Sequence, residues 1–439
     1  MHPCLRNDEL VSMICAYLFN GCLLNLHHVL SLGLTSKTIL EPCLDRIWSN
    51  IDEFHNMLLL FPTDSYEILL RDDGPFLEHE GDDHPCVIRF TRPLVPEDWT
   101  RFHYYSHRVR RLGIWGFGTM MDPDALRPLQ ESLQAHPSLA PILPKFTRLD
   151  YNDGRPGVTP YLPMFSSSSL RILQIDVACP RTLIDGVDDA IRAVAPKLVE
   201  AFPNITLLKL EGVEQSSLLR LFHIGDQTIT SPVFSKLEKL EVGSPGLFEE
   251  PVTTFTAGLQ RLKKQRIPIY DYQAPESPLD ILPVATLKSA KIEDRSLASS
   301  ASFLSAIQPE RLLTLRLKFS RRQTMWDLAS FAQLILAVAR FSSLTALTID
   351  ALALINDDHE GPSNVYELPL PSVVESMGII SPLLQLKHLE ILEVLHVNLC
   401  FDDTLLPCML KAYPCLRTLR IYPTSQAIEY GIYVPPSFP

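Results

Sequence analysis

Two short acidic clusters, each followed by histidine, are the strongest candidates for chemistry in this 439-residue sequence. They are Asp82-Asp83-His84 and Asp357-Asp358-His359, and carboxylate and imidazole groups are ligands with which a hydrolase could hold a metal ion. Both clusters lie in polar stretches flanked by glycine or proline, which are typical of solvated loops. We therefore favour loop solvation and keep a metal-dependent hydrolase as an alternative.

No other catalytic motif accompanies these clusters. The sequence contains neither His-Glu-x-x-His nor Gly-x-Ser-x-Gly, and the glycines at Gly113, Gly116 and Gly118 lack the order of a phosphate-binding loop. The sequence therefore predicts a protein that is not an enzyme, with no catalytic residues, no metal site and no cofactor.

The composition indicates the compartment and the class of partner. The nine cysteines include no Cys-x-x-Cys pair, so neither a zinc site nor a disulfide framework is indicated. A reducing compartment is expected, either the cytoplasm or the nucleus. The formal net charge of −12 argues against a nucleic-acid partner, because such proteins carry a basic face.

The first fifty residues predict three or four short helices. Asn7 is a suitable N-cap, and Asn20-Gly21 is a turn signal that ends the first helix. A second apolar stretch follows at 23–34, and a new helix is expected near Thr35. The first helix carries an apolar stripe made of Leu10, Val11, Ile14, Tyr17 and Leu18.

The segment from Leu10 to Ser36 contains no charged residue and could be mistaken for a membrane span. A span needs about 20 predominantly apolar residues in one helix, and the turn at Asn20-Gly21 divides this segment. Two short packed helices are the favoured interpretation, and no membrane association is expected.

This order of helices resembles the F-box, over about residues 5–50. The similarity is greatest to the F-box proteins of mushroom-forming fungi, whose chains also open Met-His-x-Cys-Leu and continue into a repeat region. Asp8 stands where the family usually has proline, and Thr38 stands where an aromatic residue is common. The residues that carry the resemblance are Glu9-Leu10-Val11, Ile14, Tyr17-Leu18, Leu24, Leu26, Val29-Leu30, Thr35-Ser36-Lys37 and Leu44-Asp45-Arg46-Ile47-Trp48.

The resemblance implies a role and a partner. F-box helices dock on a Skp-type adaptor, which tethers them to a cullin, so the chain is expected to be the substrate-recognition subunit of a Skp–cullin–F-box ubiquitin ligase. The alternative is a leucine-rich-repeat scaffold protein whose N-terminal helices only cap the first repeat, because solenoids require caps. The residues expected to face the adaptor are Leu10, Val11, Ile14, Leu18, Leu26 and Val29.

One motif recurs through the rest of the chain: an aromatic residue, then Pro or Ser, then apolar residues at the fourth, seventh and ninth positions. Ungapped copies span 202–210, 234–242, 341–349 and 413–421. Looser copies have their middle apolar residue at Leu112, Leu149, Leu173, Ala290, Leu315 and Leu392. Amphipathic helices are expected before several strands, at 184–201, 214–222, 324–341 and 402–413.

Helix, turn and strand in repetition predict the α/β class, as an irregular leucine-rich-repeat solenoid with a parallel inner sheet. The mean step between copies is about 34 residues, against 20–29 in regular repeats, and the long steps predict insertions near 243–286 and 350–386. The first insertion holds a basic run at 263–266, interpreted as a solvated helix face or a contact for an acidic partner. The expected domains are a helical motif at 1–55, a linking region with the first irregular repeats at 56–145, and the solenoid at 146–439.

Side chains alternate along a strand, so the apolar motif positions are expected to point into the core and the residues between them to face solvent. Together these outward residues would form the surface that binds a target protein of unknown identity. They include Lys209, Glu211, Glu241, Lys291, Arg316, Lys318, Asp350, Glu393, Arg420 and Tyr422.

Overall fold

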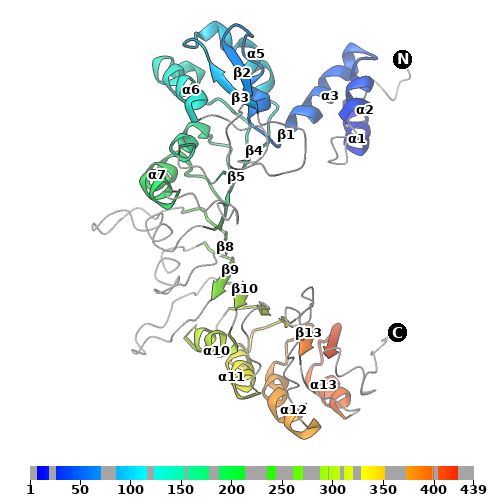
Figure 1. Ribbon diagram of the computed structural model, residues 1–439. Helices are drawn as coiled ribbons and strands as arrows, with labels where there is room; N and C mark the ends of the chain where they lie inside the picture. Colours follow the sequence, from blue (N-terminus) through cyan, green and yellow to red (C-terminus); the bar gives the residue numbers. More distant parts are fainter. Residues whose placement is uncertain are drawn as a thin grey trace. The chain divides into compact units, whose positions relative to one another are not determined.

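The computed structural model contains two compact units, Met1–Thr230 and Ser231–Pro439 (Figure 1). In each unit, parallel strands alternate with helices, so the predicted α/β class is confirmed. The units divide the chain at a place that the predicted domain boundaries did not include. The structure describes residues 7–18, 26–70, 86–115, 123–153, 157–176, 187–212, 235–243, 261–269, 287–294, 296–306, 311–319, 328–351, 372–397, 399 and 404–423.

Three helices open the first unit: α1 (Asp8–Leu18), α2 (Leu26–Gly33) and α3 (Lys37–Ser49). Asn7 is the predicted cap of α1, since its side-chain oxygen accepts hydrogen bonds from the backbone N–H groups of Glu9 and Leu10 at 2.9 and 3.2 Å. The charge-free segment thus contains two short helices, as predicted. Among the helices that the structure describes, none has the length and apolar character needed to cross a bilayer.

The three helices share a small core of their own. The Sγ atoms of Cys15 on α1 and Cys43 on α3 lie 3.4 Å apart inside it. Burial raises the pKa of the Cys43 thiol to about 12, so this thiol stays protonated and acts as a small apolar side chain. The fully buried members are Val11, Cys15, Val29, Ile39 and Cys43, with Leu18, Leu32 and Ile47 packed against them.

The sheet of the first unit is parallel, and its strands follow chain order. The looser motif copies around Leu112, Leu149 and Leu173 and the ungapped copy at 202–210 all contribute strands, as predicted. The strands are β1 (Asn50–Ile51), β4 (Arg111–Trp115), β5 (Arg148–Asn152), β6 (Ile172–Asp176) and β7 (Leu207–Glu211). The connections include α6 (Pro123–Ala135), η4 (Pro137–Leu139), η5 (Thr159–Phe165) and α7 (Val187–Ala201).

An aromatic subdomain that the sequence did not predict lies between β1 and β4. Its antiparallel pair of strands contacts Phe61 through the ring of Phe90 at 5.4 Å, and the rings of Phe61, Trp99 and Phe102 contact one another at centroid distances of 5.1 to 5.3 Å. Trp99 also donates a hydrogen bond from Nε1 to Ser132 Oγ at 3.0 Å, which ties the subdomain to α6. Its elements are α4 (His55–Leu58), β2 (Tyr66–Leu70), β3 (Cys86–Phe90), η3 (Pro96–Asp98) and α5 (Trp99–Ser106).

The sheet of the second unit is also parallel and also follows chain order, and its helices lie along one side of the strands (Figure 1). The strands are β8 (Lys239–Gly243), β9 (Lys264–Ile269), β10 (Ser289–Asp294), β11 (Thr314–Phe319), β12 (Ala346–Asp350), β13 (Ile391–Val397) and β14 (Thr418–Pro423). The helices are α10 (Leu297–Ala306), α11 (Leu328–Ala339), α12 (Val373–Ile380), η8 (Ser381–Gln385) and α13 (Leu405–Ala412).

Strand β9 corrects the prediction of an insertion near 243–286. It pairs in register with β8 and β10, so this segment supplies a full strand, and the basic run at 263–266 belongs to that strand and not to a helix. The register partners Leu240, Gln265, Ala290 and Leu315 follow one another at steps of 25 residues. This step is the length of a regular leucine-rich repeat.

The predicted alternation of side chains is confirmed in these strands. Leu240 and Val242 of β8 are buried while Glu241 between them is partly exposed, and the same pattern recurs in β10, β11 and β12. The helices predicted at 184–201, 324–341 and 402–413 are present as α7, α11 and α13, whereas 214–222 lies outside the described residues, as does most of the predicted insertion at 350–386.

Candidate protein-binding surfaces

Helix α1 carries apolar side chains on two different sides. One side faces the helical core, and the other faces solvent through Leu10 and Ile14, each 40% exposed, Met13 at 65% and Tyr17 at 87%. We call these four residues the exposed stripe. Their spacing of i, i+3, i+4 and i+7 places them on one helix face. An exposed apolar face of this kind is typical of a surface that another protein covers.

Only some of the residues predicted to face the adaptor are exposed in the structure. Leu10 and Ile14 are exposed, but Val11 and Val29 are buried in the core of the three helices, with 1% and 0% of their surface accessible. Their inclusion in a docking surface is therefore corrected: they stabilise the helices from inside. Leu18 is partly buried against the same core, and the side chain of Leu26 lies outside the description.

Helix α2 adds two further exposed apolar residues that the prediction omitted. Leu30 is 44% exposed and Leu34, just after the helix, is 74% exposed. Spacing could have indicated them, because Val29 and Leu30 are adjacent and must therefore occupy different sides of the helix. The inward residue is Val29, and the outward one is Leu30.

An ion-pair cluster anchors α3 to the segment that follows α5. The side chain of Arg108 is only 3% exposed and forms ion pairs with Glu41 and Asp45 of α3. Tyr104 donates a hydrogen bond from Oη to Glu41 Oε1 at 2.8 Å, and the rings of Trp48 and Tyr105 lie 4.5 Å apart. The hydrogen bond from Arg108 is the largest of the effects that lower the pKa of Glu41. The three helices are therefore tied through α3 to α5 and the residues that follow it.

The polar face of the first unit's sheet consists largely of charges that satisfy each other. The buried carboxylate of Asp150 accepts a hydrogen bond from Nε of Arg111 at 2.5 Å and another from Nε of Arg148 at 2.8 Å. The two predicted target-binding residues on β7 also pair with each other, since Nζ of Lys209 lies 2.9 Å from Oε1 of Glu211. These groups make the face hydrophilic but leave it little unbalanced charge.

In the second unit, Glu393 is shared by groups on the two neighbouring strands, and Glu293 by one group on a neighbouring strand and one on its own strand. Glu393 Oε1 lies 2.9 Å from Arg420 Nη1 and its Oε2 accepts a hydrogen bond from Thr348 at 3.0 Å. Glu293 lies 2.7 Å from Arg266 and 2.8 Å from Lys291. Burial alone would raise the pKa of Glu293, but these two hydrogen bonds outweigh it and hold the pKa below its ordinary value.

The sheet brings together the predicted target-binding residues of the second unit. Register pairs Lys291 with Arg316 and Glu293 with Lys318, so these side chains share one face. The side chain of Tyr422 lies outside the description. The structure adds Lys264 and Arg266 of β9, which sequence reasoning left in an insertion. The predicted residues on this face are Glu241, Lys291, Arg316, Lys318, Asp350, Glu393 and Arg420.

No family model matches this chain, and no curated protein matches it.

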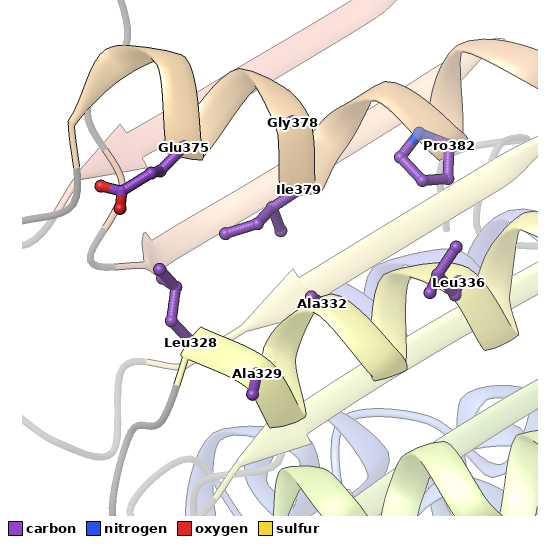
Figure 2. A pocket seen from close by; sticks show the side chains of 8 residues that line it. All are labelled: Leu328, Ala329, Ala332, Leu336, Glu375, Gly378, Ile379 and Pro382. Carbon is purple, nitrogen blue, oxygen red and sulfur yellow. The ribbon is translucent and has the colours of Figure 1, made fainter.

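A groove between α11 and α12 of the second unit is apolar (Figure 2). Its volume is about 490 Å³. The only ionisable group among its lining residues is Glu375, and Oε2 of that carboxylate accepts a hydrogen bond from the backbone N–H of Ser372 at 2.8 Å to cap α12. The groove therefore offers apolar contact without catalytic groups. Its lining is Leu328, Ala329, Ala332, Leu336, Glu375, Gly378, Ile379 and Pro382.

The clusters Asp82-Asp83-His84 and Asp357-Asp358-His359 both lie outside the described residues. Within the described ranges, no group of three or more His, Cys, Asp or Glu side chains is placed to hold a metal ion. The hydrolase alternative thus gains no support from the described part of the chain. The candidate binding surfaces of that part are the exposed stripe and the charged sheet face.

Proposed function

We propose that this protein is the substrate-recognition subunit of a Skp–cullin–F-box ubiquitin ligase. In this proposal the N-terminal helices are an F-box that docks on a Skp-type adaptor, and the parallel strands belong to a leucine-rich-repeat solenoid that presents the target. The chain supplies binding and positioning, which raise the effective concentration of the target near the ligase. The transfer chemistry belongs to other subunits.

The exposed stripe carries this proposal. Leu10, Met13, Ile14 and Tyr17 are apolar, they share one helix face, and solvent reaches all four. Burying such side chains contributes about 1.5–3 kcal/mol each when burial is complete, so four of them can supply much of the energy of a stable interface. The chain keeps an apolar surface that its own described residues do not cover.

The connection between α3 and its neighbours supports the same role. A substrate receptor has to hold its adaptor and its target at a fixed distance, which requires a stiff joint. Arg108, Glu41 and Asp45 form such a joint, because a buried guanidinium with two carboxylate partners is costly to separate.

That joint also favours a second candidate, a repeat scaffold protein in which the helices are only a cap. A cap has to be attached to the first repeat, and α3 is attached to β1 without an intervening loop. The two candidates differ in what they require of α1. A cap needs only its buried side, with Val11 and Cys15, whereas an F-box also needs the exposed stripe.

The decisive experiment replaces Leu10 and Ile14 together by aspartate and measures binding to a purified Skp-type adaptor by titration calorimetry. The wild type should form a complex, and the double variant should bind more weakly by a factor on the order of a hundred or more, because two central apolar contacts are lost. Circular dichroism should be unchanged, since both side chains are already 40% exposed.

The control is Val374→Asp in α12, which places one aspartate on an apolar residue that is 80% exposed in the second unit. It should bind the adaptor like the wild type. Undiminished binding by the Leu10 and Ile14 variant would refute the docking assignment, and a wild type that does not bind the adaptor would leave the scaffold function.

A further inference from the structure

Five basic side chains gather on the polar face of three adjacent strands in the second unit. We call them the basic face: Lys264 and Arg266 on β9, Lys291 on β10, and Arg316 and Lys318 on β11. The parallel register places Arg266, Lys291 and Arg316 in one row across the strands, with Lys264 before the row and Lys318 after it. Adjacent strands lie about 4.8 Å apart, so these cations are close neighbours.

The charges of the basic face are poorly balanced. The one carboxylate among them is Glu293, and its two oxygens are already taken by Arg266 and Lys291 at 2.7 and 2.8 Å. Arg316 and Lys318 are exposed, and within the described ranges no carboxylate lies at ion-pair distance from either. On β9, β10 and β11 this face thus carries five cations and one carboxylate, although the formal net charge of the protein is −12; Glu241 of β8 and Asp350 of β12 stand opposite Arg266 and Lys318 on the flanking strands.

Other strands of the same sheet show that this imbalance is local. On β8, Nζ of Lys239 lies 2.5 Å from Oε1 of Glu241, and between β13 and β14 Glu393 pairs with Arg420 at 2.9 Å. The cations Lys239 and Arg420, elsewhere in this sheet, are therefore each paired with a carboxylate of the protein itself. Holding like charges side by side costs free energy, and a partner of opposite charge removes that cost.

We infer that the basic face binds an acidic, extended segment of the target protein, in which glutamate or aspartate carboxylates pair with Arg316, Lys318 and Lys291. This inference rests on the proposed function, since it names the chemistry of the target that the repeat region would present. Arg316 and Lys318 supply the unpaired charges. The ammonium group of Lys291 can form ion pairs with both Glu293 and a carboxylate of the peptide.

The arrangement of the cations favours a peptide over other anions. They are spread over two directions, about 4.8 Å apart across strands and about 6.8 Å apart along β11, whereas a single phosphate group is bound by donors that converge on one point. Side chains on one face of an extended peptide repeat at the same 6.8 Å spacing. The phosphates of a longer nucleic acid would extend beyond this face to the carboxylates of Glu241 and Asp350, which flank it and would repel them.

The test uses the full chain and a fluorescein-labelled dodecapeptide of alternating glutamate and serine, with fluorescence anisotropy as the measurement. The wild type should bind this peptide and should not bind the matching glutamine–serine peptide. The Arg316→Glu/Lys318→Glu variant should bind the acidic peptide roughly tenfold or more weakly, because like charges then face each other. Both side chains are exposed, so the variant should fold normally.

A matched control separates local from overall charge. Lys387→Glu/Lys411→Glu changes the net charge by the same amount at two exposed sites of the second unit outside the basic face, and it should bind the peptide within about twofold of the wild type. Equal losses in both double variants, equal binding of the glutamine peptide, or tighter and variant-sensitive binding of a twelve-nucleotide single-stranded DNA would each overturn the inference.

The Skp-type adaptor titration gives an independent readout, since Arg316 and Lys318 lie in the other unit from the exposed stripe. Adaptor binding without peptide binding would refute this inference alone. Peptide binding without adaptor binding would refute the proposed ligase role and leave an acidic-peptide-binding repeat protein.

Discussion

Two glycines inside regular elements differ sharply in what surrounds them. A Cβ added to Gly113 in β4 would lie 2.2 Å from the carbonyl oxygen of Asp52 and 2.2 Å from Nε1 of Trp115. A Cβ added to Gly378 in α12 would meet nothing within 4 Å. Gly113 allows the backbone of Asp52 to approach β4 closely, whereas packing does not require a glycine at position 378.

Replacing Gly113 by alanine should therefore destabilise the first unit by about 1–3 kcal/mol, because the backbone of Asp52 has to move. Differential scanning calorimetry of the full chain measures this as a lower melting temperature. Gly378→Ala is the matched control and should be neutral or stabilising by up to about 1 kcal/mol, since alanine is the better helix former. A Gly113→Ala variant that melts like the control would contradict the packing described for β4.

At the scale of elements, the joint between α3 and the segment after α5 depends on the ionisation of Glu41. The pKa of this carboxyl is lowered, chiefly by its hydrogen bond from Arg108. A lowered pKa in the folded state means that the stabilisation is complete above the ordinary value of 4.5 and is lost as the pH falls through the lowered pKa. Acid should therefore loosen the joint.

We expect Glu41→Gln to reduce the free energy of unfolding at pH 7 by about 0.5–1 kcal/mol, a modest value because the carboxylate is 55% exposed. Between pH 7 and pH 3 the melting temperature of the wild type should fall more steeply than that of the variant, which has already lost the titrating group. Thermal unfolding followed by circular dichroism gives both curves. Parallel curves would show that Glu41 does not contribute to the joint.

The elements also show what the sequence could predict and what it could not. The strands that carry apolar residues at all three motif positions were predicted correctly, as at 234–242 and 341–349. Strand β9 was missed because Gln265 stands at the middle position, where Leu240 and Ala290 stand in its neighbours, and a polar residue there hides the motif. Pattern alone does not reveal a strand that its neighbours specify.

The exposed stripe was predicted only in part for a different reason. Helix α1 is apolar on two sides, so periodicity indicates an amphipathic helix but not which side its own chain covers. That choice depends on α3, whose buried residues Ile39 and Cys43 receive Val11 and Cys15. The basic face likewise needed register, because its residues come from three strands that are separated in the sequence.

For the whole molecule, sequential pairing of parallel strands limits how far a local change is felt. In the second unit β12 pairs with β11 and β13, and Leu347 of β12 is fully buried. Replacing Leu347 by alanine should cost about 2–5 kcal/mol of local stability. Stability in such arrays is a sum over elements and their nearest neighbours, so the loss should be concentrated around β12.

Hydrogen exchange followed by mass spectrometry tests this prediction on the full chain. Amides of β11, β12 and β13 should exchange faster in the Leu347→Ala variant, while those of β4, β5 and β6 in the first unit should keep their wild-type rates. Equal acceleration throughout both units would mean that the protein unfolds as one cooperative body, contrary to the division at residue 230.

The constant step of 25 residues from β8 to β11 has a consequence for how this region tolerates changes in length. Duplicating or deleting one whole step within that stretch adds or removes a single strand. The inward and outward side chains of the strands on either side still pair in register. Inserting or deleting a single residue inside a strand would instead exchange its inward and outward side chains and put polar residues under the helices. For the same reason, the basic face can become wider or narrower by whole strands while the rest of the sheet stays unchanged.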